Sequence, residues 1–162
     1  MVAMLVLSAV LSAQDPPVHH VRASDAKVAA LLNAGMSHST TFREIVDTLD
    51  RSDVVVYVES KTDRQALGGY LKHSVVAAGE YRYLQIAIEA RGSERRLVSL
   101  LAHELQHAVE VSQHKDVRDA RAMEQLFNSL AIKFGCDGST CTETQAAKDV
   151  EATVNAELKA AH

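Results

Sequence analysis

The segment from Ser93 to Gln113 constrains the fold most, because its apolar residues recur at helical spacing along its whole length. It reads SERRLVSLLAHELQHAVEVSQ. One apolar stripe runs along it, formed by Leu97, Leu101, Leu105 and Ala108 or Val109. A long helix with one such stripe is stable only when the stripe packs against other elements. The segment therefore predicts a central helix around which the rest of the chain is arranged.

The polar face of this predicted helix carries the pentapeptide HELQH, from His103 to His107. Residues four apart on a helix lie one turn apart on the same face, so both imidazoles can bind one ion. Glu104 lies on the flank, where its carboxylate can reach a water molecule on that ion without being a ligand itself. The alternative is a solvent-exposed helix face with two histidines, which the helical setting of the motif makes the weaker interpretation.

The chemistry that this pattern favours is hydrolysis with a Zn²⁺ cofactor. Zinc bound by two imidazoles and one further protein ligand lowers the pKa of its water to about 7. Glu104 can then act as the general base and pass the proton to a leaving amine. The sequence thus predicts a zinc metallopeptidase acting on a peptide or protein substrate. The rival hypothesis is a non-catalytic protein in which zinc has a structural or partner-binding role.

HELQHAVE resembles the zincin-type metallopeptidases, in which a sheet precedes a helix that carries HExxH. It is similar to the version in small exported bacterial proteins. The resemblance is strongest over residues 93–113 and only architectural elsewhere. It implies that His103 and His107 bind zinc and that Glu104 is the general base. It also implies an edge strand before the helix that binds substrate in extended form.

The third zinc ligand distinguishes the zincin subfamilies. The metzincin pattern HExxHxxGxxH requires Gly at position 110 and His at position 113, where this chain has Glu110 and Gln113. A gluzincin-like arrangement takes a glutamate from a later helix instead. We favour Glu143, because it opens the last predicted helix beside a possible N-cap at Thr142 and ETQAA resembles the family's Glu-x-x-Ala segments. Glu124 remains the alternative, since its distance from the motif fits thermolysin-like spacing.

Supporting roles are predicted for other polar residues. Glu110 lies seven residues after His103 on the ligand face, which favours a second-shell carboxylate that accepts an imidazole N–H. The family's partner carboxylate would stand at position 147, where this chain has Ala147. Four residues are candidates by type for a donor to the developing oxyanion: Tyr57, Tyr83, His114 and Arg118.

The order of predicted elements favours an α+β fold. Helices are predicted over residues 24–34 and 41–50, strands over 53–59, 67–77 and 81–89, and further helices over 116–134 and 142–161. We expect the last two strands to form a hairpin and all three to form a meander packed on the 93–113 helix. The strand at 53–59 is rich in valine, which predicts burial on both faces. Because strands and helices are segregated, a doubly wound parallel sheet is disfavoured.

Length and composition restrict the remaining possibilities. At 162 residues we expect a single domain, over residues 23–162. The net charge of −4, with cations scattered along the chain, argues against a nucleic-acid partner, and the mean hydropathy argues against stable insertion in a membrane. The absence of Trp and an aromatic content of 4% argue against a stacking platform. The sequence leaves the oligomeric state open.

Two short segments bear on the compartment. The apolar residues 1–13, MVAMLVLSAVLSA, precede a polar Pro-containing stretch and predict a signal peptide, hence a secreted or periplasmic protein. An N-terminal core helix and an uncleaved anchor are the alternatives. Cys136 and Cys141 could close a small disulfide loop in such a compartment, or remain two free thiols.

Overall fold

The computed structural model describes residues 19–61, 68–89, 91–132 and 143–161. The elements are β1 (Val21–Ala23), α1 (Ala26–His38), α2 (Thr40–Asp50), β2 (Val54–Lys61), β3 (Gly69–Leu71), β4 (Val76–Ala78), β5 (Tyr81–Glu89), α3 (Glu94–Gln113), α4 (Ala120–Leu130) and α5 (Gln145–Ala160). The fold is α+β, as predicted. The predicted signal peptide and both cysteines lie outside the described residues.

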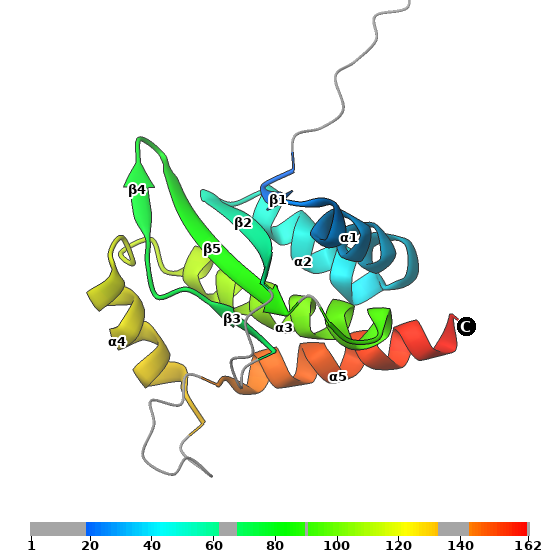
Figure 1. Cartoon of the computed structure of the whole chain (residues 1–162). Coiled ribbons are helices and arrows are strands. Elements are labelled where there is room, and N and C mark those ends of the chain that lie inside the picture. Colours follow the sequence, from blue (N-terminus) through cyan, green and yellow to red (C-terminus); the bar gives the residue numbers. More distant parts are fainter. Residues whose placement is uncertain (1–18, 62–67, 90, 133–142, 162) are drawn as a thin grey trace, which may run out of the picture.

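The strands form one mixed sheet in the order β1-β2-β5-β3, with β4 also paired to β5 (Figure 1). The hairpin prediction holds, because β3 and β4 both run antiparallel to β5. The meander prediction is wrong, because β2 pairs with β5 in parallel and the chain passes beyond β5 to build β3. The sheet also has five strands rather than about three. β1 and β4 are three residues long, too short to give a periodic signal in the sequence.

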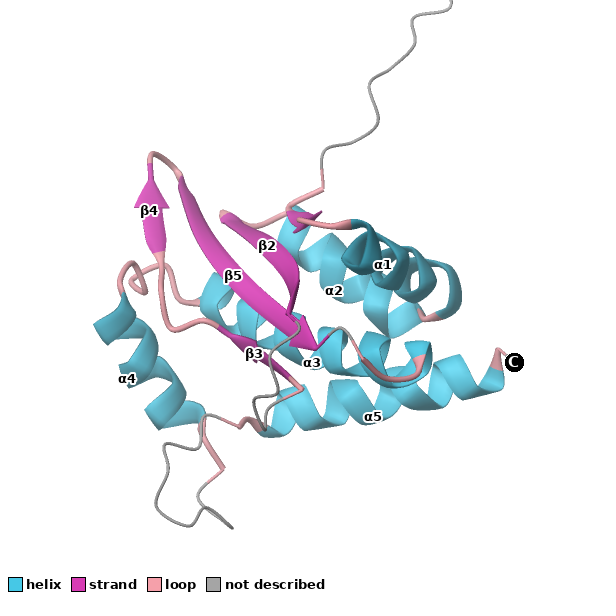
Figure 2. Cartoon of the chain, viewed as in Figure 1, coloured by secondary structure: helices cyan, strands magenta, loops and turns pink. Residues whose placement is uncertain are grey.

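Helices cover one face of this sheet. α1, α2 and α3 contact the strands, and α5 packs along α3 on the side away from the sheet (Figure 2). On β5, Leu84, Ile86 and Ile88 are fully buried on the covered face. The prediction that β2 is buried on both faces is wrong at Tyr57. Its side chain points to the open face and is 36% exposed. α3 is therefore enclosed between the sheet and α5.

Side-chain caps define the starts of the helices, and α1 ends later than predicted. Asp25 caps α1 by accepting a hydrogen bond from the Val28 N–H, and Ser93 caps α3 in the same way through Arg96. The helix predicted over residues 24–34 ends later than expected, because α1 continues past Gly35 to His38. The ring of Phe42 lies 2.7 Å from where a Cβ at Gly35 would be, so the glycine serves close packing rather than termination.

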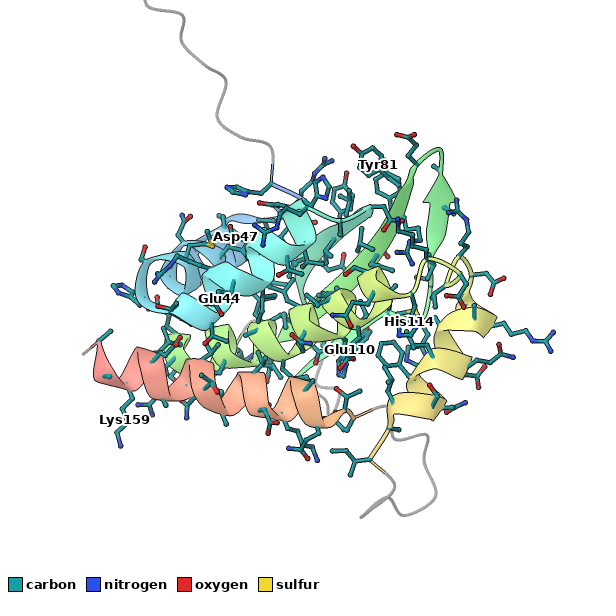
Figure 3. The ribbon with its side chains drawn as sticks, turned by 180° about the vertical axis from the view of Figure 1, so that it is seen from behind. Glu44, Asp47, Tyr81, Glu110, His114 and Lys159 are labelled. Carbon is teal, nitrogen blue, oxygen red and sulfur yellow. The ribbon has the colours of Figure 1, made fainter. Side chains whose placement is uncertain are left out.

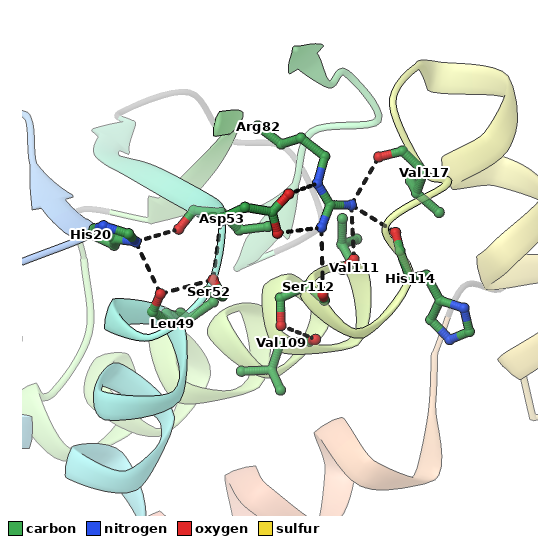
Figure 4. A network of polar contacts seen from close by, with 11 residues as sticks. His20, Leu49, Ser52, Asp53, Arg82, Val109, Val111, Ser112, His114 and Val117 are labelled. Carbon is green, nitrogen blue, oxygen red and sulfur yellow. Dashed lines mark hydrogen bonds and ion pairs between the residues drawn. The ribbon is translucent and has the colours of Figure 1, made fainter. Parts of the chain in front are cut away.

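Arg82, a residue with no predicted role, connects the sheet to the end of α3. Its side chain is fully buried, and its guanidinium donates two hydrogen bonds of 2.8 Å to the Asp53 carboxylate (Figure 4). The same guanidinium donates to the backbone carbonyls of Val111, His114 and Val117. Carbonyls at a helix C-terminus have no partner within the helix, so Arg82 satisfies them and fixes α3 against β5.

Among the described residues, no helix combines the length and apolar character needed to cross a bilayer.

Candidate metal centre

The polar face of α3 is buried, although the sequence predicts only that it lies opposite the leucine stripe. His103, Glu104 and His107 are 5%, 5% and 6% exposed. They lie between the sheet and α5, whose contacts with α3 are among the most extensive between elements. The alternative weighed from the sequence, a solvent-exposed helix face with two histidines, is therefore wrong. Buried imidazoles and carboxylates need partners, and those partners define the site.

His103, His107 and Glu143 converge on one point. One ligand atom from each lies within 4.8 Å of the other two, and His103 Nε2 is 3.3 Å from a carboxylate oxygen of Glu143. The described residues contain no second group of three His, Cys, Asp or Glu side chains at this spacing. Of the two glutamates considered for the third ligand position, the structure brings Glu143 to the histidines and leaves Glu124 exposed on α4.

Glu143 is positioned by the start of α5. The helix begins two residues later than a cap at Thr142 would place it, because Thr144 is the N-cap and its hydroxyl accepts a hydrogen bond from the Ala147 N–H. Thr142 itself lies outside the described residues. Glu143 directly precedes that cap and is half-exposed. The close packing of α5 on α3 thus places a carboxylate from late in the chain beside the two imidazoles.

The outer nitrogen of His107 is held by Glu110, the residue predicted to accept from an imidazole. His107 Nδ1 lies 2.9 Å from Glu110 Oε2, and the other oxygen of Glu110 accepts a 2.6 Å hydrogen bond from Thr144. Glu110 lies where α3 passes the start of α5 (Figure 3). The N-cap of α5 and the orientation of His107 therefore depend on one carboxylate. Phe127 of α4 packs edge-on against the same imidazole.

His103 has an equivalent partner that the sequence analysis missed. Its Nδ1 lies 3.0 Å from a carboxylate oxygen of Glu151 on α5. On the last helix, the position considered for a partner carboxylate was 147, one turn earlier, where the fully buried Ala147 lets α5 approach α3 closely. Glu151 follows Ala147 by four residues and so lies on the same face, which is the signal that could have identified it.

The two outer contacts orient both rings. Histidines that bind metals donate their second N–H to a carboxylate or carbonyl, which fixes the tautomer and the ring plane. With Nδ1 directed to Glu110 or Glu151, the Nε2 atom of each ring is left for an ion. The ring planes of His103 and His107 are 81° apart with centroids separated by 5.0 Å, so the rings approach a common point from different directions.

Glu104 connects the cluster to the edge of the sheet. One of its oxygens accepts a 2.9 Å hydrogen bond from the backbone N–H of Leu71 on β3. Burial raises the pKa of Glu104, although the nearby His107 and His103 and the Leu71 hydrogen bond act in the opposite direction. A carboxylate with a raised pKa holds a proton more readily than an exposed one, which suits a group that takes up and releases protons.

The charges around His103 favour a cation. Burial would lower the pKa of this imidazole, but the hydrogen bond with Glu143 and the charges of Glu104, Glu143 and Glu151 outweigh it and raise the pKa. The same contact with His103 lowers the pKa of Glu143. Carboxylates thus surround the point where Glu143 meets the two imidazoles, and a positive charge is stabilised there.

The predicted oxyanion donors are not brought to the cluster. Tyr57 and Tyr83 stack on each other on the open face of the sheet, with the strands between them and α3. His114 follows the last turn of α3, and Arg118 is exposed. No contact joins any of the four to His103, His107 or Glu143 in the described part of the chain.

Comparison of the chain with protein-family models, curated proteins and solved structures gives no match. The function is therefore inferred from the geometry of the site. Two imidazoles and a carboxylate are ligands that zinc and other divalent first-row metals accept.

Proposed function

We propose that this chain is a zinc-dependent metallopeptidase with a zincin-like arrangement. The main support is the convergence of His103, His107 and Glu143. Glu104 lies beside the two histidines and accepts a hydrogen bond from β3. Three nitrogen and oxygen donors leave a fourth position open, as in hydrolytic rather than structural zinc sites. A zinc ion bound there would supply a Lewis acid and lower the pKa of water.

Glu104 is the proposed general base. The Leu71 N–H binds one carboxylate oxygen and fixes the direction of the side chain, so the second oxygen is available for proton transfer. Glu104 takes the proton from the attacking water and returns it to the leaving amine. A purely structural histidine pair has no need of a buried carboxylate at this position.

The outer edge of β3, along which none of the described strands pairs, supports a peptide as the substrate. β3 ends the sheet order, and its Tyr70 pairs with Ala87 of β5. Backbone direction alternates along an antiparallel strand, so the N–H and C=O groups of the neighbouring residues Gly69 and Leu71 point away from β5. The bond from Leu71 to Glu104 shows that this edge faces the cluster. An extended peptide added along it would gain main-chain hydrogen bonds and cross the metal site.

The whole-chain architecture supports the zincin-like proposal. Parallel strands, an antiparallel edge strand and a helix with HELQH are followed by a later helix that brings Glu143. The resemblance implies a sheet, then a helix with HExxH, then a later helix that supplies a glutamate, and these elements follow one another in that order here.

The test uses zinc-loaded protein and a mixed peptide pool, with cleavage measured by mass spectrometry. We expect Glu104→Gln to retain zinc and lose hydrolysis by at least about a hundredfold, because base catalysis contributes that much. The matched control is Glu94→Gln, an exposed glutamate in the first turn of the same helix. Hydrolysis by Glu104→Gln at the rate of the wild type would contradict the mechanism.

A non-catalytic zinc site is the second candidate, and the deep burial of His103 and His107 favours it. In that case the wild type would bind zinc and show no cleavage of any peptide. Glu104→Gln would then change only stability. The same measurements therefore separate the two functions.

A further inference from the structure

A groove lies between the first turns of α3 and the middle of α5, outside the metal cluster. Its volume is about 410 Å³. The lining residues are Ser93, Arg95, Arg96, Ser99, Lys148, Glu151, Ala152 and Asn155. We call this site the α3–α5 groove. Polar side chains from both helices line it, so it suits a polar or charged ligand rather than an apolar one.

The cations of the α3–α5 groove are largely without partners. Arg95 and Lys148 form no ion pair with any described residue, although Lys148 acts on Glu143 through longer-range charge. Arg96 lies 3.3 Å from Glu89, an exposed contact that neutralises it only in part. Three cations thus surround one carboxylate in a chain whose net charge is −4. The groove is a local positive site on an acidic protein.

The groove adjoins the metal cluster in two places. Glu151 lines the groove and also holds His103 Nδ1 at 3.0 Å. Gly68, directly before β3, approaches Arg96 so closely that a Cβ there would lie 3.0 Å from the guanidinium. A chain lying along the outer edge of β3 therefore has the positive groove near one end.

We propose that the α3–α5 groove binds a carboxylate of the peptide substrate, so that the site selects peptides with acidic residues on one side of the cleaved bond. The inference rests on the proposed peptidase function. Single carboxylates fit better than a phosphate dianion, because Glu151 repels negative charge from within the groove. The amide of Asn155 and the hydroxyl of Ser93 add neutral hydrogen-bonding groups to the lining.

The test measures peptide binding without hydrolysis. Zinc-loaded Glu104→Gln protein is titrated into a fluorescent peptide that contains glutamates, and into the same peptide with glutamines. We expect the acidic peptide to bind about five- to tenfold more tightly, the gain that a few solvent-exposed ion pairs provide. Raising the salt from about 50 mM to about 500 mM should remove most of the difference.

The control variants distinguish an effect of the groove from an effect of the protein's overall charge. Added to Glu104→Gln, the pair Arg95→Gln and Lys148→Gln should remove most of the preference, because only Arg96, partly paired with Glu89, remains in the groove. Arg121→Gln and Lys159→Gln remove the same charge outside the groove and should retain the preference. Zinc content is measured in every variant. Equal affinity for both peptides, or equal losses in both pairs, would overturn the proposal.

The two proposals fail separately. If wild-type protein cleaves peptides but shows no acidic preference in binding, the groove assignment is wrong and the peptidase stands. If the acidic preference depends on Arg95 and Lys148 while no peptide is cleaved, the groove binds acidic peptides as ligands, and both the peptidase and the substrate assignment are wrong.

Discussion

Individual residues of the site differ in how far the sequence predicts them. His103, Glu104 and His107 share one helix, so their spacing alone brings them together. Glu143 was preferred to Glu124 on local capping and resemblance, and the structure places it beside the histidines. Glu151 was missed because its contact with His103 exists only after α5 docks on α3, and no local pattern encodes that register.

Glu151 should matter for metal affinity without being a ligand. We expect Glu151→Gln to weaken zinc binding by about 10- to 100-fold, because the variant no longer holds the His103 ring with a charged acceptor. Asp149→Asn is the control, since Asp149 is an exposed acid on the same helix. Competitive titration with a zinc chelator measures both. Equal affinities in the two variants would show that Glu151 has no such role.

At the scale of elements, periodicity predicts helices and strands well but not how they pair. Along β5, the alternation of apolar and polar residues from Tyr83 to Ile86 matches the alternation of buried and more exposed positions. It gave no information on direction, so the parallel pairing of β2 with β5 was missed. Arg82 was missed for a similar reason. The role of a buried arginine in a strand can be recognised only when the carbonyls at the end of α3 are known to lie beside it.

The Asp53–Arg82 pair should stabilise the junction of β5 and α3. We expect Asp53→Asn to lower the free energy of unfolding by about 2–3 kcal/mol at pH 7, because a buried guanidinium loses its counter-charge. Asp47→Asn, at an exposed position on α2, should change little. Urea denaturation monitored by circular dichroism gives both values.

The same pair predicts a pH dependence. Hydrogen bonds from Arg82 lower the pKa of Asp53 below its ordinary value of 3.8. A carboxylate with a lowered folded-state pKa contributes stability above its unfolded pKa, and the contribution is lost as the pH falls through the folded value. The difference in unfolding free energy between wild type and Asp53→Asn should therefore shrink below about pH 4. A difference that grows in acid would contradict this assignment.

For the whole molecule, the order of helices and strands was enough to predict α+β but not the mixed sheet. The proposed metal site joins distant parts of the chain, since His103 and His107 lie on α3 and Glu143 lies before α5. A long loop of chain must be closed to bring these ligands together, and a bound ion offsets part of that entropy. The stability of the entire domain should therefore depend on zinc.

Zinc should raise the free energy of unfolding by about 4 kcal/mol when its free concentration is a thousand times the dissociation constant. His103→Ala should abolish this increase, because it removes one ligand of the cluster. Calorimetric scans with zinc and with a chelator test the prediction. Unfolding curves that are identical with and without zinc would mean that the ion does not bind the folded domain.

X-ray absorption spectroscopy of the zinc-loaded protein tests the central claim most directly. The proposed site predicts about one zinc per chain with two nitrogen donors at about 2.0–2.1 Å and carboxylate oxygen at about 2.0–2.2 Å, the nitrogens coming from His103 and His107. Glu143→Gln should alter this coordination and Glu124→Gln should leave it unchanged. A folded protein that binds no zinc, or one whose zinc coordination persists in His103→Ala, would contradict the account.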